Sequence, residues 1–410
     1  GILPQQITHF RSLRFLNISN NYFMGALPGN TSNLMNLEVF DAFNNNFDGS
    51  LPLELTLCLN LRHLNLGGNF LAGPIHPQYG NMENLEYLNM AGNNLSGHIP
   101  PELGNLHSLK ALFLGYFNVF HGSIPMELGS IHNLEVLDLS ESGLNGMIPP
   151  SLGYLTKLNT LFLQNNSFTG SIPSRLGRIS SLKSLDLSNN YLSGTIPIEL
   201  CDLVELELLG LLYNHIHGSI PDCIGTLPKL EVLKLFNNNL SGQIPARLGH
   251  MNPRLRQLDL SYNALSGPIP PHLCHGKNLE WLLLLENRIS GQIPFALGFC
   301  ESLTRIRLGS NELSGSIPSG FFFFPRLDIL ELSSNNLQGL ALPDFSHNVS
   351  VVSIINLANN HLIGPLPLSM GNMRGLEKLD LSNNRINGTI PDQIGLLSEH
   401  LSTLDLSRNL

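Results

Sequence analysis

Apolar and polar residues alternate in short stretches that recur along the whole chain. In residues 303–308, for example, Leu303, Ile306 and Leu308 are apolar while Arg305 and Arg307 between them are charged. Because successive side chains of a strand point to opposite faces, each stretch predicts a strand with an apolar inner face and an open outer face. The stretches begin at Leu13, Leu37, Leu61, Leu85, Leu109, Leu134, Leu158, Leu182, Leu206, Leu230, Leu255, Leu279, Leu303, Leu327, Val352, Leu376 and Leu401.

The spacing of these predicted strands is nearly constant, since consecutive starts differ by 24 or 25 residues. The units that begin at Leu279 and Leu303, for example, both fit LxxLxLxxNxLxGxIP, the plant form of the leucine-rich repeat. A fixed period of this length predicts a solenoid, in which each unit buries its leucines against its neighbours. We therefore predict a leucine-rich-repeat solenoid of the α/β type, plant LxGxIP subtype, wound as a right-handed superhelix with a parallel concave β-sheet.

The domain prediction is a single array of about 17 repeats covering residues 1–410. The chain begins in the tail of one repeat and stops in the strand of another. Repeat arrays need polar caps over the open ends of their cores. We therefore expect both caps to be missing and the chain to be a piece of a longer protein.

Other repeat positions are predicted to serve the fold. The Asn that closes the strand pattern, such as Asn190, is expected to turn inward and satisfy backbone groups where the strand ends. The Gly of LxG, such as Gly97, suits a positive φ, and the Pro of IP, such as Pro100, fixes φ at the entry to a back-side turn or short helix.

Composition and the lack of known motifs argue against several classes of function. Charged residues make up 13% of the chain and the formal net charge is -9, whereas nucleic acids and anionic membranes attract clustered Lys and Arg. No apolar run approaches the ~20 residues of a membrane span. The sequence contains no GxSxG, HExxH, Walker or kinase catalytic motif, and its histidines form no ligand-spaced cluster. We predict no enzyme activity, cofactor or metal in this chain.

Several predicted strands carry large apolar or basic residues on the open face, where small and acidic residues are common in other repeats. Such a series is better explained by a ligand groove than by chance. An extended dodecapeptide reaches about 40 Å and would cross roughly eight strands at ~4.8 Å each. Eight strands counted back from Leu303, with Leu303 included, end at Leu134. The groove residues are Phe113, Tyr116, Phe117, Phe162, Leu208, Leu212, Lys234, Phe236, Trp281, Leu283 and Leu285.

Arg305 and Arg307 are predicted to stand side by side at one end of this series. Planar guanidinium groups offer paired donors and are well suited to holding a carboxylate. The alternative is a pair of solvated charges that form ion pairs with Asp328, Glu331 or Glu286.

Cys274 and Cys300 occupy nearly equivalent back-face positions in adjacent repeats, as do Cys201 and Cys223. Each pair is a candidate disulfide, and the alternative is buried thiols that fill small gaps in the core. In the run Phe321 to Phe324, the first and last residues take core positions. The middle two are expected to pack against the neighbouring coil, with an apolar patch for a second protein as the alternative.

Asn-x-Ser/Thr sequons favour the secretory route when they are taken together with the repeat type. We expect glycans on Asn94, Asn165 and Asn239 rather than on Asn17, which is predicted to lie on the open face. The candidate sites are Asn17, Asn30, Asn94, Asn165, Asn239, Asn348 and Asn387.

The sequence is similar to the ectodomains of plant leucine-rich-repeat receptor kinases. The RxR of SLTRIRLGSNELSGSIP resembles the motif with which several peptide-hormone receptors hold the last residue of the ligand. Two stretches, LFLGYFNVFHGSIPMELG and PPHLCHGKNLEWLLLLENRISGQIPFALGFCESLTRIRLG, resemble the CLAVATA and BARELY ANY MERISTEM clade.

This resemblance implies a secreted CLE peptide of about 12 residues as ligand, with Arg305 and Arg307 on its free C-terminal carboxylate. It further implies a SERK-type or related co-receptor kinase that docks near the C-terminal repeats. The protein would lie on the extracellular side of the plasma membrane, with an intracellular Ser/Thr kinase domain in the full-length receptor.

Two other functions stay open. One is a receptor for another peptide that an RxR motif reads, such as an abscission or danger signal. The other is a secreted inhibitor of cell-wall-degrading enzymes, built on the same repeat.

Overall fold

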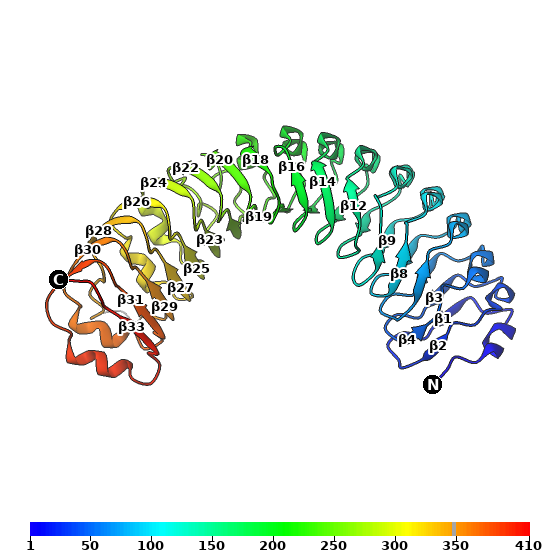
Figure 1. Cartoon of the computed structure of the whole chain (residues 1–410), viewed down its shortest axis with the longest axis horizontal. Helices are drawn as coiled ribbons and strands as arrows, with labels where there is room; N and C mark the ends of the chain where they lie inside the picture. Colours follow the sequence, from blue (N-terminus) through cyan, green and yellow to red (C-terminus); the bar gives the residue numbers. More distant parts are fainter. Residues whose placement is uncertain (347–349) are drawn as a thin grey trace. The chain divides into compact units, whose positions relative to one another are not determined.

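The computed structural model describes residues 1–346 and 350–410, which form two compact units. Unit 1 contains residues 1–206 and 213–215, and unit 2 contains residues 207–212 and 216–410. Both units are built from the predicted repeat, and in Figure 1 each coil contributes one strand to a row of parallel strands. The leucine-rich-repeat fold is therefore confirmed in each unit.

The main sheet of unit 1 pairs its strands in parallel and in chain order, as Phe15↔Val39 and Val136↔Thr160 illustrate. In each strand of three residues the middle one is buried. The strands are β1 (Phe15–Asn17), β3 (Val39–Asp41), β5 (His63–Asn65), β7 (Tyr87–Asn89), β9 (Ala111–Phe113), β11 (Val136–Asp138), β13 (Thr160–Phe162) and β15 (Ser184–Asp186).

The main sheet of unit 2 has the same parallel register, as in Trp281↔Arg305 and Leu283↔Arg307. The inward residues Leu303, Ile306 and Leu308 are fully buried, as predicted. The strands are β17 (Leu208–Gly210), β19 (Val232–Lys234), β21 (Gln257–Asp259), β23 (Trp281–Leu283), β25 (Arg305–Arg307), β27 (Ile329–Glu331), β29 (Ile354–Asn356), β31 (Lys378–Asp380) and β33 (Thr403–Asp405).

A second strand of two to five residues lies in each LxGxIP segment and pairs with its equivalent in an adjacent coil. At its end Gly97 has φ +83°, in the left-handed region that favours glycine, as expected. In unit 1 these strands are β2 (Met24–Ala26), β4 (Asn46–Asp48), β6 (Ala72–Pro74), β8 (Asn94–Gly97), β10 (Val119–Phe120), β12 (Asn145–Met147), β14 (Ser167–Ser171) and β16 (Tyr191–Ser193). In unit 2 they are β18 (His217–Ser219), β20 (Asn239–Gln243), β22 (Ala264–Gly267), β24 (Arg288–Gln292), β26 (Glu312–Gly315), β28 (Asn336–Leu340), β30 (His361–Gly364) and β32 (Arg385–Ile386).

The back of most coils is a short 3-10 helix, which a Pro precedes at the predicted position. Among the described residues the helices are 3-10 rather than α, so the helical half of the repeat is the tighter form. In unit 1 they are η1 (Gln5–His9), η2 (Thr31–Asn33), η3 (Leu53–Leu57), η4 (Pro77–Asn81), η5 (Pro101–Asn105), η6 (Met126–Ser130), η7 (Pro150–Tyr154), η8 (Ser174–Arg178) and η9 (Ile198–Asp202). In unit 2 they are η10 (Asp222–Thr226), η11 (Phe295–Phe299), η12 (Ser319–Phe323), η13 (Leu368–Asn372) and η14 (Asp392–Leu397).

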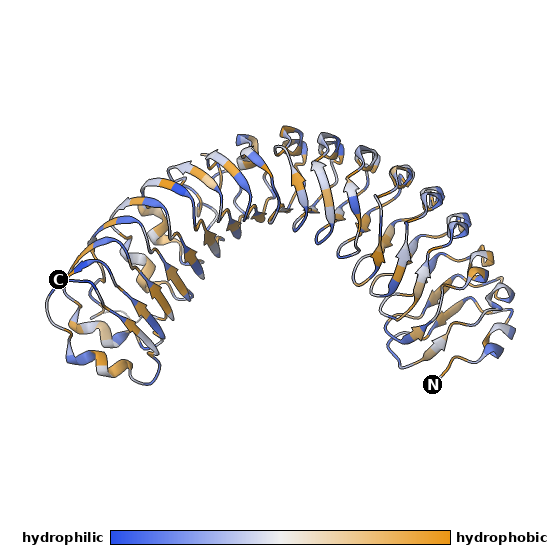
Figure 2. Ribbon diagram, viewed as in Figure 1, coloured by the Kyte–Doolittle hydropathy of each residue, from blue (hydrophilic) through white to orange (hydrophobic). Residues whose placement is uncertain are grey.

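The core of each unit lies between the main strands and the back of the coils, where the repeat leucines stack. Figure 2 shows apolar residues recurring in the strands of successive coils. Phe321 and Phe324 are core residues, as predicted. Phe322 is also buried, and both it and Phe323 contact Phe345 of the next coil, with ring centroids 6.3 and 5.5 Å apart. The predicted packing against the neighbouring coil is therefore confirmed.

The closing asparagines turn inward, as Asn190 shows. Its Nδ2 donates to the carbonyl oxygens of Leu163, Leu187 and Ser188, and its Oδ1 accepts from the Phe168 N–H. One amide thus satisfies backbone groups in its own coil and in the previous one, and it ties neighbouring repeats together.

A disulfide joins Cys274 to Cys300 in unit 2, which confirms the first predicted pair. The second predicted pair, Cys201 and Cys223, has one cysteine in each unit, and its pairing stays a prediction. Cys58 is a buried free thiol.

Candidate functional site

The open face of each main sheet carries three rows of side chains, taken from the first and third residues of each strand and the second residue after it. In unit 2 the first row runs Leu208, Val232, Gln257, Trp281, Arg305, Ile329 and Ile354. The second row runs Gly210, Lys234, Asp259, Leu283, Arg307, Glu331 and Asn356.

Second-row side chains usually serve the turn that follows their own strand. The Asp259 Oδ1, for example, accepts from the N–H of Ser261, two residues ahead, at 3.1 Å. A side-chain acceptor at this position satisfies a backbone donor that leaves the ladder. The acceptors of this kind are Asn17, Asp41, Asn65, Asn89, Asp138, Asp186, Asp259, Glu331, Asn356, Asp380 and Asp405.

The remaining strands have a second-row residue without any side-chain acceptor. Gly, Phe, Leu, Lys and Arg cannot accept a hydrogen bond from the turn. These positions lack a bond that stabilises the fold in the other strands, which makes them candidates for another use of the open face. They are Phe113, Phe162, Gly210, Lys234, Leu283 and Arg307, and all but Gly210 are predicted site residues.

Arg305 and Arg307 project from β25 on the open face, and both are exposed. In the described part of the chain neither guanidinium lies within ion-pair distance of a carboxylate. The suggested partners Asp328, Glu331 and Glu286 are therefore not engaged by them. The site keeps two adjacent sets of guanidinium donors available.

Glu331 is in register with Arg307, yet its carboxylate is occupied by other donors. The Ser333 N–H and hydroxyl donate to its Oε1 at 2.9 and 2.6 Å, and Asn356 Nδ2 donates to its Oε2 at 3.0 Å. Gly309 leaves room for this arrangement, since a Cβ there would come within 2.7 Å of Oε1. These bonds hold the acid in its turn.

The indole ring of Trp281, in the first row, lies near two cationic side chains. Arg305 Cζ lies 5.1 Å from the centroid of the indole, and Lys234 Nζ lies 5.9 Å from the same centroid. Both distances fall within the range of cation–π attraction. The ring therefore limits the orientations of Arg305 and supplies an apolar surface beside it.

Asp259 lies in the second row between Lys234 and Leu283. Burial raises the pKa of its carboxyl, and hydrogen bonds from Ser261 together with the charges of Lys234 and Arg307 oppose that rise. The acid therefore partly neutralises the basic surface when it ionises.

The other predicted residues of unit 2 form the apolar part of the open face. Leu283 and Leu285 lie beside the arginine strand, and Leu208, Leu212 and Phe236 lie on β17 and β19 or directly after them. Tyr262, which the sequence reasoning did not single out, packs edge-on against Phe236 with centroids 5.2 Å apart. Tyr262 follows Phe236 by 26 residues, which is about one repeat. This spacing could have indicated that the two rings lie in adjacent coils.

In unit 1, Phe113 and Phe162 lie in the second row on either side of Asp138. Tyr116 and Phe117 follow β9 with consecutive positive φ angles of 55° and 59°, where the extra residue of this repeat enlarges the turn. Phe117 is 78% exposed. Phe113 and Phe162 are on the open face as predicted, whereas Tyr116 and Phe117 lie in the turn beyond the three rows, and their place in the groove stays a prediction.

The sequence reasoning missed an aromatic stack beside Phe113. His63 and Tyr87 stack with centroids 4.3 Å apart and an interplanar angle of 9°, and Tyr87 continues to Phe113 at 5.6 Å. Burial lowers the pKa of His63, and Asp41 partly opposes the shift. Their spacing of 24 residues was the signal that could have revealed the stack.

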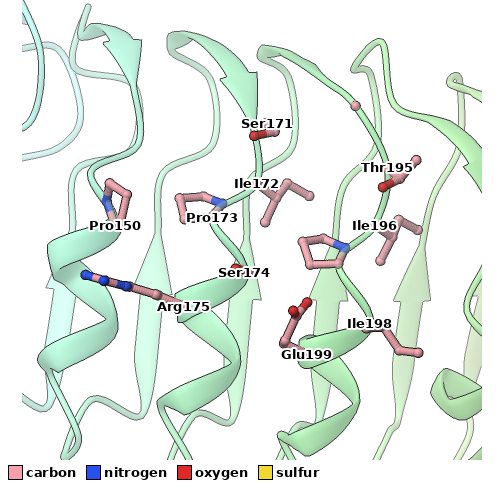
Figure 3. Close-up of a pocket in the computed structure, with 12 residues that line it drawn as sticks. Pro150, Ser171, Ile172, Pro173, Ser174, Arg175, Thr195, Ile196, Ile198 and Glu199 are labelled. Atoms are coloured by element: carbon pink, nitrogen blue, oxygen red, sulfur yellow. The ribbon is translucent and has the colours of Figure 1, made fainter.

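A groove of about 1000 Å³ lies on a different side of unit 1. Figure 3 shows the prolines and isoleucines of successive IP turns lining it, with Arg175 and Glu199 rising from the 3-10 helices. None of the predicted site residues lines this groove. The groove is formed by the IP turns and 3-10 helices of successive coils.

The sequons that the structure describes, Asn17, Asn30, Asn94, Asn165, Asn239 and Asn387, are exposed. Asn348 lies outside the described residues. Within residues 1–346 and 350–410 no cluster of His, Cys, Asp or Glu is arranged to hold a metal ion, and no helix is long and apolar enough to cross a membrane.

Comparison with known proteins gives the family. A leucine-rich repeat region model matches residues 101–266, and a leucine rich repeat model matches residues 12–34, 84–106, 302–324 and 375–397. No curated protein sequence matches the chain. Among solved structures, a TDR receptor is 36% identical with a TM-score of 0.87, and the match covers 100% of this chain and 78% of that one. The chain belongs to the leucine-rich-repeat ectodomains of plant receptor kinases.

Two other similar ectodomains were solved as complexes. The Arabidopsis receptor kinase HAESA, with the peptide hormone IDA and the co-receptor SERK1, is 35% identical over 100% of this chain and 80% of that one, with a TM-score of 0.76. PEPR1 with AtPEP1 is 31% identical over 100% and 67%, with a TM-score of 0.79. Ectodomains of this family therefore include peptide-hormone receptors. The comparisons do not distinguish the CLAVATA clade within the family.

Proposed function

We propose that this ectodomain binds a short CLE-type peptide on the open face of its sheet, with Arg305 and Arg307 holding the C-terminal carboxylate of the ligand. The observation that carries the proposal is the pair of guanidinium groups on β25, which have no acid partner among the described residues although Glu331 lies in register with one of them. Two adjacent guanidinium groups offer a carboxylate paired, charge-assisted donors.

The surroundings of the pair suit the end of a peptide. Leu283 and Leu285 offer apolar contacts beside the charge, and Trp281 orients Arg305. A hydrogen bond to a charged group contributes about 1.5–3 kcal/mol, so two such contacts together account for about 100-fold or more in affinity.

A second candidate ligand is a peptide of the IDA type. The sequence identity of the chain to HAESA, which was solved with IDA, is 35%, close to its 36% identity to the TDR receptor. An arginine pair alone recognises a terminal carboxylate and does not choose between peptide classes. A panel of synthetic peptides from both classes separates the two.

The test is calorimetric titration of the secreted ectodomain with a CLE-type dodecapeptide, as free acid and as C-terminal amide. We expect the free acid to bind, and both the amide and the double variant Arg305→Ala/Arg307→Ala to lose about 100-fold in affinity. Equal binding of acid and amide, or full affinity in the double variant, would refute the carboxylate anchor. No binding by the wild type moves the search to IDA-type peptides.

We also propose that a SERK-type or related co-receptor kinase docks on the C-terminal repeats of unit 2, once peptide is bound. Exposed apolar side chains support this surface: Leu340 and Ile363 are in register on β28 and β30, and Ile390 follows two coils after Leu340. The receptor would face the outside of the plasma membrane, and an intracellular kinase would carry the signal. Peptide-dependent co-elution with a SERK ectodomain, and its loss in Ile363→Asp, tests the docking surface.

A further inference from the structure

Gln164 and Ser188 are neighbours in the third row of unit 1, in the turns after β13 and β15. Two backbone hydrogen bonds keep these turns in register, from the Leu163 N–H to the Asp186 carbonyl at 2.9 Å and from the Asn165 N–H to the Ser188 carbonyl at 3.0 Å. Neighbouring strands are about 4.8 Å apart. The two side chains therefore stand next to each other on the open side.

Both side chains hold a buried oxygen atom without a hydrogen-bond partner in the part of the chain that the structure describes. These atoms are Gln164 Oε1 and Ser188 Oγ, and Ser188 is only 2% exposed. The equivalent serines of other repeats differ, since the hydroxyls of Ser140 and Ser333 each donate to the acid two residues before them at 2.6 Å. A buried polar atom without a partner destabilises the free protein.

The repeat itself does not require a long polar residue at the Gln164 position. The same third-row position holds Gly67, Ala91 and Gly115 in earlier coils. Gln164 as a whole is only half-buried, so its carboxamide can turn outward by rotation about its side-chain bonds. A Ser hydroxyl also rotates freely to suit a partner.

The chemistry around the two oxygens selects the kind of partner. Phe162 lies in the second row of β13 and offers an apolar surface, and the acids Asp138 and Asp186 are in register on both sides of it. The surrounding side chains are thus mainly acceptors and negative charges. A group that donates hydrogen bonds fits this environment, whereas a carboxylate or another acceptor does not.

We propose that Gln164, Ser188 and Phe162 form a subsite for an N–H donor of the ligand, carried next to an apolar side chain that lies on Phe162. The inference rests on the proposed function, because it takes the ligand to be a peptide bound on an open face of the repeats. Binding would supply the partners that both oxygens lack in the free protein. The subsite lies wholly on the open face of unit 1.

The variants Ser188→Ala and Gln164→Leu test the subsite with the CLE-type dodecapeptide in its free-acid form. We expect each variant to bind about 10-fold more weakly than wild type, with a melting temperature that is unchanged or higher. Ser140→Ala is the matched control, because its hydroxyl is already bonded to Asp138. That variant should lower the melting temperature and leave peptide affinity within about 2-fold.

Modified peptides identify the donor. N-acetylation tests the terminal ammonium group, and N-methylation of single residues tests each main-chain N–H. One modification should weaken wild-type binding about 10-fold and have no further effect in the Ser188→Ala/Gln164→Leu double variant.

These experiments distinguish failure of the subsite from failure of the proposed function. Wild-type affinity in both variants, or a melting temperature that falls in Ser188→Ala as it does in Ser140→Ala, overturns the subsite and leaves the arginine anchor untouched. A wild-type protein that binds no peptide overturns both proposals.

Discussion

Arg305 lies over the indole ring of Trp281, with its guanidinium carbon 5.1 Å from the ring centroid. The two residues are in register on neighbouring strands. The ring therefore restricts a charged side chain that has no acid partner in residues 1–346 and 350–410. A side chain that is already ordered loses less entropy when it binds a ligand.

Replacement of Trp281 by Ala should weaken binding of a free-acid peptide about 10-fold, since a cation–π contact of this kind contributes about 0.5–2 kcal/mol. Trp281→Phe should keep most of the affinity. Calorimetry measures both, and Phe15→Ala, which removes an exposed aromatic residue from the first row of unit 1, is the control. Unchanged affinity in Trp281→Ala would show that Arg305 does not need the ring.

The carboxyl of Asp259 should make stability depend on pH. Its pKa is raised from the ordinary value of 3.8, chiefly by burial. The folded state then holds the proton more tightly than the unfolded state, so the free energy of unfolding falls as pH rises from about 3.8 through the folded pKa. Asp259→Asn should remove this fall and leave the melting temperature at pH 7 equal or higher.

An amide can replace the acid in the turn, because Asn356 accepts the equivalent bond from the Ala358 N–H at 3.1 Å. Melting curves of wild type and Asp259→Asn between pH 3.5 and 7 measure the difference. The same pH slope in both proteins would assign the dependence to other groups. Loss of the negative charge should also strengthen binding of a free-acid peptide at low salt.

The Cys274–Cys300 disulfide should stabilise unit 2 substantially. It closes a loop with a sequence separation of 26 residues, for which the loss of chain entropy in the unfolded state predicts about 3–4 kcal/mol. Cys274→Ser/Cys300→Ser should lower the free energy of unfolding by that amount in urea. An unchanged midpoint would mean that the adjacent coils hold this region without the bond.

Asn190→Ala should be among the more damaging substitutions in unit 1. It removes a buried amide that bonds three carbonyl oxygens and one N–H, and each buried backbone group left unpaired costs about 1–3 kcal/mol. We expect a loss of about 3 kcal/mol or more in urea denaturation. The exposed Asn94 is the control, and Asn94→Ala should stay within about 0.5 kcal/mol of wild type.

The thiol of Cys58 should resist modification in the folded protein. Burial raises its pKa from 9.0 to about 11, so little thiolate exists at pH 8. Maleimide labelling at pH 8 should be slow in the native state and fast in urea, as read by mass spectrometry. Rapid native labelling would mean that the first coils open frequently.

The sequence predicted the repeat, the open face and the exposure of Arg305 and Arg307, because these follow from alternation and period. It could not predict whether Glu331 would pair with Arg307. That outcome depends on side-chain geometry, which places Ser333 and Asn356 on the carboxylate instead.

The His63 and Tyr87 stack was predictable in principle, since both residues take the first open position of adjacent repeats. The lack of a hydrogen-bond partner at Gln164 Oε1 and Ser188 Oγ was not predictable from the sequence. Ser140 and Ser188 follow their strand acids in the same way, and only the direction of each hydroxyl separates them.

Each turn acceptor bonds an N–H two residues ahead in its own coil, as Asp138 does with Ser140. Its exchange for an apolar or basic residue removes one local bond and leaves the register of the adjacent coils intact. Most of these bonds stay within one coil, although Glu331 also accepts a bond from Asn356 of the next coil. Duplicated receptors built on this repeat can therefore diverge in what they recognise one coil at a time, while their architecture stays the same.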